Sequence, residues 1–291
     1  MMAGTGAATI RELLTGGTTV NMPGVYDALT ARLADEAGFE VLFVSGYSVS
    51  ASQLGMPDYG YLTQTEIVEA ARSVCTNTAR PVIVDADTGY GNPLNAVRTA
   101  RLLHRAGASG LFLEDQEWPK KCGHFAGKRV IERGEWLAKL RAVLDLRDEG
   151  VDLFLVARTD ARAAVSLDDA IARAKAARDL GVDAIFVEAP EGVDELERVA
   201  KEVEGVVRVA NMIEGGRTPL LTAAELHDLG YDLIVTPLSA LLAVTRAVRE
   251  VFGALRDKGT LRDDLELLVP FDDFGAVVDL EGHRSLEKRY A

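Results

Sequence analysis

Four segments of the chain share one pattern of apolar and polar positions. In each, a helical run ends in glycine, three residues follow, and a short apolar run begins. The copies begin at Ala37, Ala106, Leu180 and Leu229. The glycine suits the position just after a helix, and the apolar run is typical of a strand buried on both faces. The pattern therefore predicts the helix-to-strand junction of a βαβ unit.

Four further short apolar runs alternate with helical patterns elsewhere. They lie around Val20 and within residues 81–87, 152–160 and 206–214. Together the two sets predict eight strands that alternate with helices, without a long polar linker. This order favours an α/β fold of the (β/α)8 TIM-type barrel class, with a doubly wound open sheet as the alternative.

The length of the chain fits one domain. With 291 residues, of which 48% are hydrophobic, the chain can form a single barrel over residues 1–291 with extensions. Beyond Phe252 the alternation loosens, and residues 253–291 are predicted to form two amphipathic helices around a loop at residues 270–273. We expect this C-terminal helical tail to pack on a neighbouring subunit, and a solvated extension is the alternative.

Charge and composition exclude several partners. The chain has a formal net charge of −13. It is therefore not expected to have the basic surface that binding to nucleic acid or an anionic membrane requires. No apolar run reaches the roughly 18 residues of a membrane span, and the N-terminus lacks the regions of a signal peptide, so a cytoplasmic protein is expected. Two cysteines, Cys75 and Cys122, are too few for a disulfide framework. Cys75 lies in a helical stretch and is expected to be a small buried residue.

Polar residues collect where the predicted strands end. In the four repeats, the residues seven positions after the glycine are Ser45, Glu114, Glu188 and Pro237. The other strands are followed by Asp85, Asp87, Arg158 and Asn211. Barrels of this class carry their active sites at the carboxyl ends of the strands. We interpret this rim as a functional site, although solvation of a loop would explain any one of these residues alone.

The segment 114–125 is dense in functional groups and runs from a strand end into a long loop. Cys122 lies among Lys120, Lys121 and His124, an electropositive setting that lowers the pKa of a thiol from about 8.5. Gly123 allows a sharp turn or a close approach of the backbone to a ligand. A zinc site at Cys122 and His124 is the alternative, but the remaining His and Cys residues lack metal-ligand spacing.

A second cluster, residues 85–92, ends a buried strand with Asp85 and Asp87 before a glycine-rich loop. Residues i and i+2 of an extended chain point the same way, so the two carboxylates can face one ion. Oxygen ligands without histidine favour Mg2+ or Mn2+ over zinc. The loop is too short for a P-loop and lacks its Lys-Ser/Thr ending, so a phosphate-binding role is weakly supported.

Two further features suit a carboxylate ligand. Residues 45–48, Ser-Gly-Tyr-Ser, have the small side chains and exposed amides of a carboxylate-binding turn. Arg158 can hold a carboxylate with two hydrogen bonds. An ion pair between Arg158 and Glu188 at the barrel mouth is the alternative for Arg158, and it does not exclude a role in binding substrate.

Lys120-Lys121-Cys122-Gly123-His124 resembles the Lys-[Lys/Arg]-Cys-Gly-His motif of the isocitrate lyase and phosphoenolpyruvate mutase superfamily. The segments 85–92, 114–116, 157–162 and 211–219 resemble this superfamily in the same order, and the resemblance extends from about Arg11 to Tyr290. Within the superfamily, the chain is most similar to the branch of the petal death protein and 2,3-dimethylmalate lyase, with methylisocitrate lyase near.

This resemblance implies a barrel whose last helix is swapped between subunits of a homotetramer, a dimer of helix-swapped dimers. It implies Mg2+ held by Asp85, with Asp58, Asp87 and Glu114 in its water shell. It places on a gating loop Lys120, Cys122 and His124, with Cys122 as the general acid. It assigns substrate binding to Ser45, Gly46, Arg158, Glu188 and Asn211. The catalytic base would be Tyr47 or a water held by Asp58.

The implied activity is that of a metal-dependent carbon–carbon lyase. It would cleave a 2-hydroxy di- or tricarboxylate, of the 2-alkylmalate or 2-methylisocitrate type, to a 2-keto acid and a carboxylate. Members that hydrolyse oxaloacetate tend to carry Ser at the position of Pro237, so we expect that hydrolysis to be weak or absent. A carboxyphosphoenolpyruvate mutase is the alternative enzyme, and a scaffold protein without turnover is the third hypothesis.

Overall fold

The structure is a computed structural model, and it describes residues 6–123 and 127–291. The chain divides into two compact units, the first ending at Leu238 and the second comprising Ser239–Ala291. None of the helices in the described ranges is both long and apolar enough to cross a membrane.

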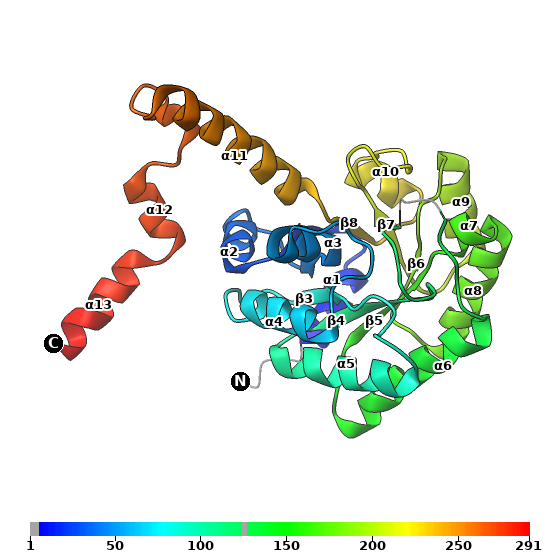
Figure 1. Cartoon of the computed structure of the whole chain (residues 1–291). Coiled ribbons are helices and arrows are strands. Elements are labelled where there is room, and N and C mark those ends of the chain that lie inside the picture. Colours follow the sequence, from blue (N-terminus) through cyan, green and yellow to red (C-terminus); the bar gives the residue numbers. More distant parts are fainter. Residues whose placement is uncertain (1–5, 124–126) are drawn as a thin grey trace. The chain divides into compact units, whose positions relative to one another are not determined.

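The first unit is a closed barrel of eight parallel strands, in which each strand pairs with the next along the chain and β8 pairs with β1 (Figure 1). The strands are β1 (Val20–Val25), β2 (Leu42–Val44), β3 (Val82–Asp85), β4 (Gly110–Glu114), β5 (Phe154–Thr159), β6 (Ala184–Val187), β7 (Val207–Asn211) and β8 (Leu233–Thr236). All eight strands fall within the predicted apolar runs. The barrel prediction is therefore confirmed, and the open sheet is excluded.

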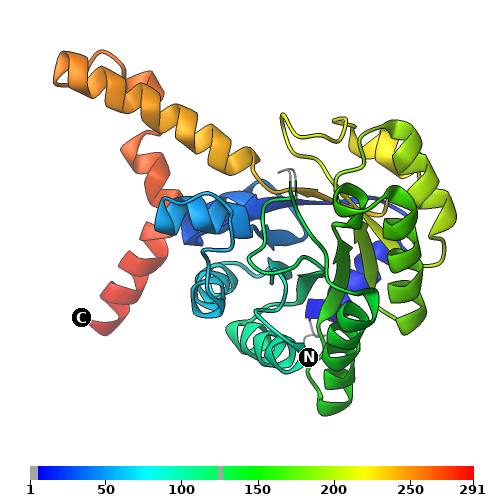
Figure 2. The same cartoon turned by 45° about the vertical axis from the view of Figure 1, so that its right-hand side comes forward.

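Helices surround the strands as an outer ring (Figure 2). The longer ones are α2 (Ala28–Glu36), α4 (Gln64–Cys75), α5 (Pro93–Ala106), α6 (Arg133–Leu144), α8 (Leu167–Leu180), α9 (Val193–Glu202) and α10 (Ala223–Asp228). Short turns of helix are α3 (Gly46–Val49), η1 (Ser50–Leu54), η2 (Asp145–Glu149) and α7 (Ala161–Ala164).

The glycines of the four repeats have the backbone conformation that the pattern predicts. Their φ angles are 85° at Gly38, 102° at Gly107, 89° at Gly181 and 90° at Gly230. This left-handed region costs glycine no clash with a Cβ, so the chain can leave each helix and enter the next strand within a few residues. Equal spacing then brings the residue seven positions later to the same end of each strand.

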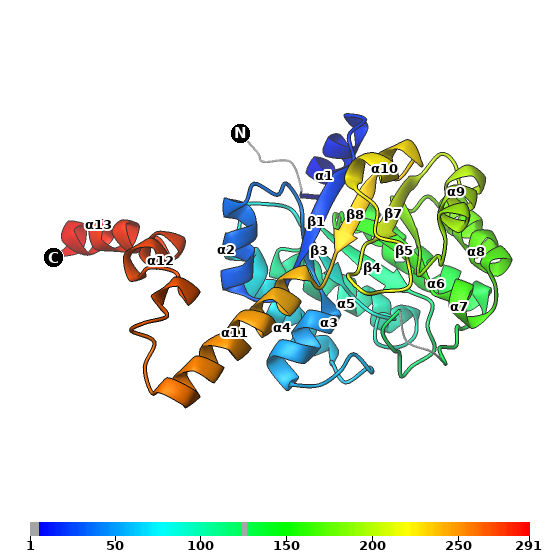
Figure 3. The same ribbon diagram turned by 90° about the horizontal axis from the view of Figure 1, so that it is seen from above.

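The helix α1 (Gly6–Thr15) lies beside the starting ends of β1 and β8 (Figure 3). Its Ile10 is fully buried in one core cluster with Phe43, Phe112 and Phe186 of the barrel interior. Arg11 binds Asp152 and Asp183, which lie within two residues of the starts of β5 and β6. The amino end of the barrel is thus closed by packing, and the carboxyl end is left for polar groups.

The second unit consists of α11 (Ser239–Lys258), η3 (Leu265–Leu267), α12 (Phe271–Val277) and α13 (Leu280–Tyr290). The predicted loop at residues 270–273 is wrong, because Phe271 begins α12. Pro270 immediately precedes the helix with φ −54°, and Asp272 and Asp273 suit the positive end of the helix dipole. None of these helices contains a buried residue.

Candidate active site

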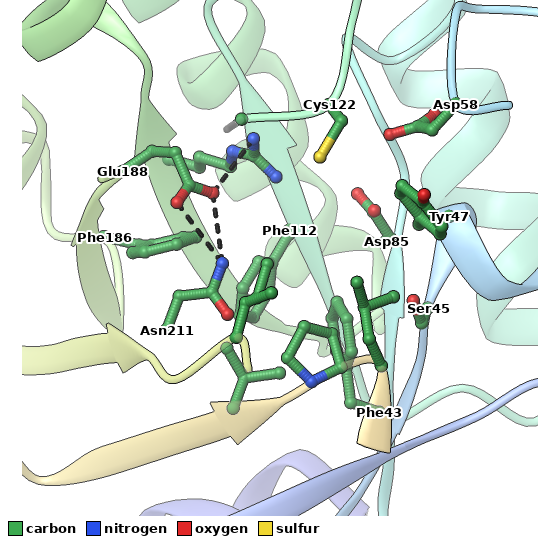
Figure 4. A pocket seen from close by; sticks show the side chains of 16 residues that line it. Phe43, Ser45, Tyr47, Asp58, Asp85, Phe112, Cys122, Phe186, Glu188 and Asn211 are labelled. Carbon is green, nitrogen blue, oxygen red and sulfur yellow. Dashed lines mark hydrogen bonds and ion pairs between the residues drawn. The ribbon is translucent and has the colours of Figure 1, made fainter. Parts of the chain in front are cut away.

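A small cavity of about 40 Å³ lies at the carboxyl ends of the barrel strands (Figure 4). Eight of the predicted site residues line it: Ser45, Tyr47, Asp58, Asp85, Cys122, Arg158, Glu188 and Asn211. The rest of the wall is Gly123 and the apolar side chains of Phe43, Phe112, Phe186, Ile213, Val235, Pro237 and Leu238. Functional groups from distant parts of the sequence therefore meet at the predicted rim.

The remaining predicted residues lie outside this lining. His124 falls outside the described residues. Asp87, Glu114 and Lys120 are buried. Lys120 pairs with Asp58 of the lining and Glu114 pairs with Arg158 of the lining, whereas Asp87 pairs with Lys120. Gly46 packs closely on Asp85, since a Cβ on Gly46 would fall 2.9 Å from Asp85 Oδ2.

Lys120 joins two of the predicted acidic residues. Its Nζ lies 2.7 Å from Asp58 Oδ1 and 2.6 Å from Asp87 Oδ1, and the side chain is 2% exposed. Burial alone would lower the pKa of Lys120, but the charges of Asp87 and Asp58 raise it well above the ordinary value. The ammonium group is therefore held in the charged form between the two carboxylates.

Asp87 and Glu114 are buried carboxylic acids whose charged forms are destabilised by burial. Burial raises the pKa of Asp87 to about 6, although Lys120 opposes this shift. Burial raises the pKa of Glu114 well above its ordinary value, against the charges of Arg158 and Lys120. Among the described residues, Glu114 Oε1 has no hydrogen-bond partner. A buried, unpaired carboxylate oxygen indicates that a cation or an ordered water belongs beside it.

This acidic group fits a divalent cation that keeps much of its water. Within residues 6–123 and 127–291, no group of three or more His, Cys, Asp or Glu side chains is close enough to hold an ion directly. Mg2+ commonly binds one or two carboxylates and several waters. Asp85 faces the cavity and Glu114 has a free oxygen, so the donors present are the hard oxygens that Mg2+ and Mn2+ prefer.

Arg158, at the end of β5, is held by three acids. Its Nε lies 2.9 Å from Asp160 Oδ2 and 3.3 Å from Glu114 Oε2, and its Nη2 lies 3.1 Å from Glu188 Oε2. The guanidinium also lies over the ring of Phe186. The ion pair with Glu188 that the sequence allowed is thus present. Because Arg158 also lines the cavity, it can bind substrate from this fixed position.

Asn211 and Glu188 form the next contact along this wall. Asn211 Nδ2 donates to Glu188 Oε1 at 3.2 Å, and Glu188 is 1% exposed. Figure 4 shows the two side chains facing each other at the cavity edge. The carboxylate of Glu188 therefore contacts both Asn211 and Arg158, and it orients the amide of Asn211.

The loop that follows β4 brings Cys122 over the cavity. The amide of Cys122 donates to the carbonyl of Asp58 at 3.0 Å, and the side chain of Gln116 exchanges two hydrogen bonds with the backbone of Lys121. The sulfur points into the cavity between Glu188 on one side and Asp58 and Asp85 on the other (Figure 4). Cys122 is 8% exposed, so this position excludes most water from the thiol.

The turn at residues 45–48 forms the first turn of α3. Ser45 caps this helix by accepting a hydrogen bond from the amide of Ser48, and the hydroxyl of Ser48 donates to the carbonyl of Pro237. Burial, together with Cys122 and Asp58, raises the pKa of Tyr47 above its ordinary value. Tyr47 therefore stays protonated at neutral pH and can donate a hydrogen bond into the cavity.

Two buried charged residues near the site were not selected from the sequence. Asp160 holds Arg158, and Lys128 Nζ contacts Asp160 Oδ1 at 2.8 Å. Asp160 had a signal, since it follows Arg158 by two residues at the same strand end. Lys128 had none, because a lysine in a polar loop is usually solvated.

The barrel, its rim of acids and arginine, and the thiol over the cavity define a TIM-barrel enzyme. Residues 10–256 match the family model described as phosphoenolpyruvate phosphomutase. The chain belongs to this family, within the superfamily of phosphoenolpyruvate mutases and isocitrate lyases, whose named members include lyases, mutases and hydrolases.

Three relatives align over nearly the whole chain. The chloroplastic carboxyvinyl-carboxyphosphonate phosphorylmutase of Arabidopsis thaliana is 50% identical, over 94% of this chain and 81% of the relative. The petal death protein of Dianthus caryophyllus is 47% identical, over 97% and 88%. The 2,3-dimethylmalate lyase of Eubacterium barkeri is 41% identical, over 98% of both. The predicted superfamily and branch are thus confirmed.

Solved structures agree with this assignment. A crystal structure of 2,3-dimethylmalate lyase matches with a TM-score of 0.93 and 32% identity, over 99% of this chain and 96% of that chain. A phosphonopyruvate hydrolase in complex with oxalate and Mg++ matches with a TM-score of 0.88 and 28% identity, over 99% of both. A divalent metal therefore occurs in this superfamily.

Proposed function

We propose that this protein is a divalent-metal-dependent lyase that cleaves the C2–C3 bond of a 2-alkylmalate. The observation that carries the proposal is the position of Cys122, whose thiol faces the cavity between Glu188 on one side and Asp58 and Asp85 on the other. Glu188 is itself paired with Arg158, the cation of the lining. A thiol in this place can deliver a proton to the carbon that leaves with the bonding electrons. The products are a 2-keto acid and a carboxylate.

The carboxylates of the rim are assigned to the metal. Asp85 would hold the ion, and Asp58, Asp87 and Glu114 would bind its waters. The unpaired Glu114 Oε1 and the all-oxygen donor set support this assignment. When bound, Mg2+ or Mn2+ supplies a Lewis acid for the 2-hydroxyl and the neighbouring carboxylate of the substrate.

Arg158 binds the second carboxylate. Of the described residues that line the cavity, Arg158 is the one cation, and the lining also contains the apolar side chains of Ile213, Val235, Pro237 and Leu238. A dicarboxylate with an alkyl group matches a lining that has one cation and several apolar side chains. A third carboxylate, as in methylisocitrate, would lie against apolar side chains and lose hydration without a partner. We therefore favour 2-alkylmalates among the possible substrates.

Proton transfer is assigned to two sides of the cavity. Cys122 is the general acid, and the hydrogen bond from its backbone N–H to the carbonyl of Asp58 holds this residue over the site. Tyr47 has a raised pKa and can donate a hydrogen bond, so the base is assigned to a water held by Asp58. Ser45 and Gly46 supply polar groups for the carboxylate next to C2, and Asn211 orients Glu188. The role of His124 on the same loop remains a prediction from the motif.

A pyruvate assay tests the proposal. The 2-keto acid released by cleavage is pyruvate from 2-methylmalate, 2,3-dimethylmalate and methylisocitrate, and 2-oxobutanoate from 2-ethylmalate. It is measured by its reduction with NADH and lactate dehydrogenase, with Mg2+ and then with EDTA. We expect release from at least one 2-alkylmalate that EDTA abolishes. No keto acid from the whole panel, with metal binding confirmed by calorimetry, would reject the lyase.

The second candidate is a phosphonate-forming mutase. The identity of 50% to the phosphorylmutase of Arabidopsis thaliana favours it. A phosphoryl group adds negative charge, whereas the described lining holds one cation beside Asp58, Asp85 and Glu188. Phosphorus NMR with carboxyphosphoenolpyruvate as substrate separates the two, because only the mutase gives a carbon–phosphorus signal.

We also propose that the second unit packs on a neighbouring copy in a homotetramer. No residue of α11 is buried, and Leu242, Val248 and Phe252 are 46%, 40% and 65% exposed. An apolar helix face of this kind needs a cover in water. Light scattering of the full chain tests the mass, and a monomer at micromolar concentration would reject the proposal.

A further inference from the structure

We propose that Lys128 is a positioning residue, which fixes Cys122 relative to Arg158. The inference rests on the proposed function, because it concerns how the proton donor is held. Lys128 Nζ donates one hydrogen bond to the carbonyl of Gly123 and a second to Asp160 Oδ1, at 2.8 Å for the second. Gly123 directly follows Cys122, so the first bond restrains the residue that carries the thiol.

Asp160 connects Lys128 to the arginine of the cavity. Its Oδ2 accepts from Arg158 Nε at 2.9 Å. The side chains of Lys128 and Asp160 are 1% and 0% exposed. Hydrogen bonds between charged groups are about twice as strong as neutral ones, and removal of one buried partner leaves the other charge uncompensated. One buried lysine thus links the loop with the guanidinium.

The Asp160 end of this link is itself fixed. Asp115 Oδ1 accepts from the amide of Asp160 at 2.8 Å, and Asp115 Oδ2 accepts from the hydroxyl of Thr159 at 2.6 Å. Arg173 also donates to Asp115 Oδ2. These bonds join the ends of β4 and β5 below the loop. Through its two bonds, Lys128 therefore holds Gly123 at a fixed place relative to these strand ends.

Gly123 is restrained from its other side by Glu188. A Cβ added at Gly123 would fall 2.5 Å from Glu188 Cδ, so the backbone passes directly over this carboxylate. Arg158 already neutralises part of the charge of Asp160. If the ion pair of Lys128 with Asp160 only stabilised the barrel, Lys128 would need no bond to Gly123. The bond of Lys128 to the carbonyl of Gly123 therefore acts on the residue next to Cys122 rather than on the barrel core.

The test compares how fast iodoacetamide alkylates Cys122 in the full chain, followed by mass spectrometry. We expect Lys128→Met to speed alkylation of Cys122 about tenfold to a hundredfold, as expected for the loss of a charge-assisted hydrogen bond. Cys75, which lies at the end of α4, is the internal reference and should react at an unchanged rate. The rates need no substrate, so they report on Lys128 even if the lyase proposal fails.

Arg129→Met is the matched control. Arg129 is the next residue, and it pairs with Glu117 at 2.6 Å, but its side chain is 76% exposed. We expect its effect on alkylation to stay within about twofold, because exposed ion pairs contribute little. If Lys128→Met does not fold, Lys128→Gln is the second variant. It is polar, but it is shorter by one atom and carries no charge, so it cannot keep both bonds and should still speed alkylation of Cys122.

Kinetics give a second readout. In Lys128→Met the kcat for a 2-alkylmalate should fall about tenfold or more, while KM changes less than about threefold, because Arg158 keeps its contacts with Asp160 and Glu188. Equal alkylation rates of Cys122 in Lys128→Met and in the unaltered protein would overturn the inference. Absence of turnover in the unaltered protein would instead reject the proposed function.

Discussion

The backbone of Gly123 lies against the carboxyl group of Glu188. A Cβ at Gly123 would fall 2.5 Å from Cγ, Cδ and Oε2 of Glu188. Glu188 has little room to yield, because Arg158 and Asn211 hold its two oxygens and the side chain is 1% exposed. The motif glycine is therefore required for a close approach to a side chain of the site, where the sequence suggested a turn or a ligand.

We expect Gly123→Ala to lower kcat/KM for a 2-alkylmalate about a hundredfold, since a displacement of 1 Å at a reacting group costs about that much. The pyruvate assay measures it. Gly134→Ala is the control, because a Cβ at Gly134 in α6 meets no atom within 4 Å. Equal activity of Gly123→Ala and the unaltered protein would show that the loop tolerates a side chain here.

Replacement of Cys122 tests its role as the general acid. Cys122→Ser keeps the size of the side chain but replaces the thiol with a hydroxyl, which is a much weaker acid. We expect kcat to fall about 10²-fold to 10⁴-fold, the range for loss of a positioned acid or base. Cys75→Ser is the matched control, because Cys75 lies at the end of α4, outside the cavity lining, and should leave kcat unchanged. Full activity of Cys122→Ser would reassign the proton donor.

The barrel was predictable because its signals are local and repeated. Gly38, Gly107, Gly181 and Gly230 each follow a helix with a positive φ, and each precedes a strand at fixed spacing. The residue seven positions later then reaches the strand end in every copy. The failure at residues 270–273 has the opposite cause: Pro and Asp are common in turns and at helix starts alike, and only the following residues decide between the two.

The sequence predicted which residues surround the cavity better than it predicted which of them contact one another. Strand ends and the Lys-Lys-Cys-Gly-His motif located the residues around the cavity, but their partners depend on distances across the barrel. The contact of Lys120 with Asp58 and Asp87 spans 62 and 33 positions of the chain. Lys128 was missed because its burial follows from the loop path, which no short pattern encodes.

At the amino end of the barrel, Arg11 offers a test of stability without an effect on chemistry. It donates to Asp152 through Nη1 and Nη2 and to Asp183 through Nε, each at 2.8 Å, and its side chain is 34% exposed. We expect Arg11→Met to lower the free energy of unfolding by about 1–2 kcal/mol, after allowance for solvent screening. Urea unfolding measures the loss, and kcat should not change.

Arg72→Met is the control for Arg11. Arg72 on α4 faces Glu69 at 3.5 Å with both side chains about half exposed or more. Its loss should change the free energy of unfolding by less than about 0.5 kcal/mol. An equal effect of the two substitutions would mean that the contact of α1 with the strand starts adds no stability beyond a surface ion pair.

Arg158→Lys decides between the two interpretations of this residue, a carboxylate clamp or an ion pair of the barrel mouth. A lysine ammonium cannot keep the contacts with Asp160, Glu114 and Glu188 at once, nor offer two parallel donors to a substrate carboxylate. We expect KM for a 2-alkylmalate to rise about tenfold to a hundredfold, as for the loss of a charge-assisted hydrogen bond.

The unfolding free energy of the same variant separates the two roles. If Arg158 is a carboxylate clamp, the Arg158→Lys variant binds substrate more weakly. Its fold keeps most of its stability, because a positive charge remains opposite the three acids. If Arg158 forms only a structural ion pair, the variant has a lower free energy of unfolding, and its KM stays close to that of the unaltered protein. Measured together by urea unfolding and the pyruvate assay, a raised KM with a small change in stability supports the clamp, and the reverse pattern would move the substrate carboxylate to another part of the cavity.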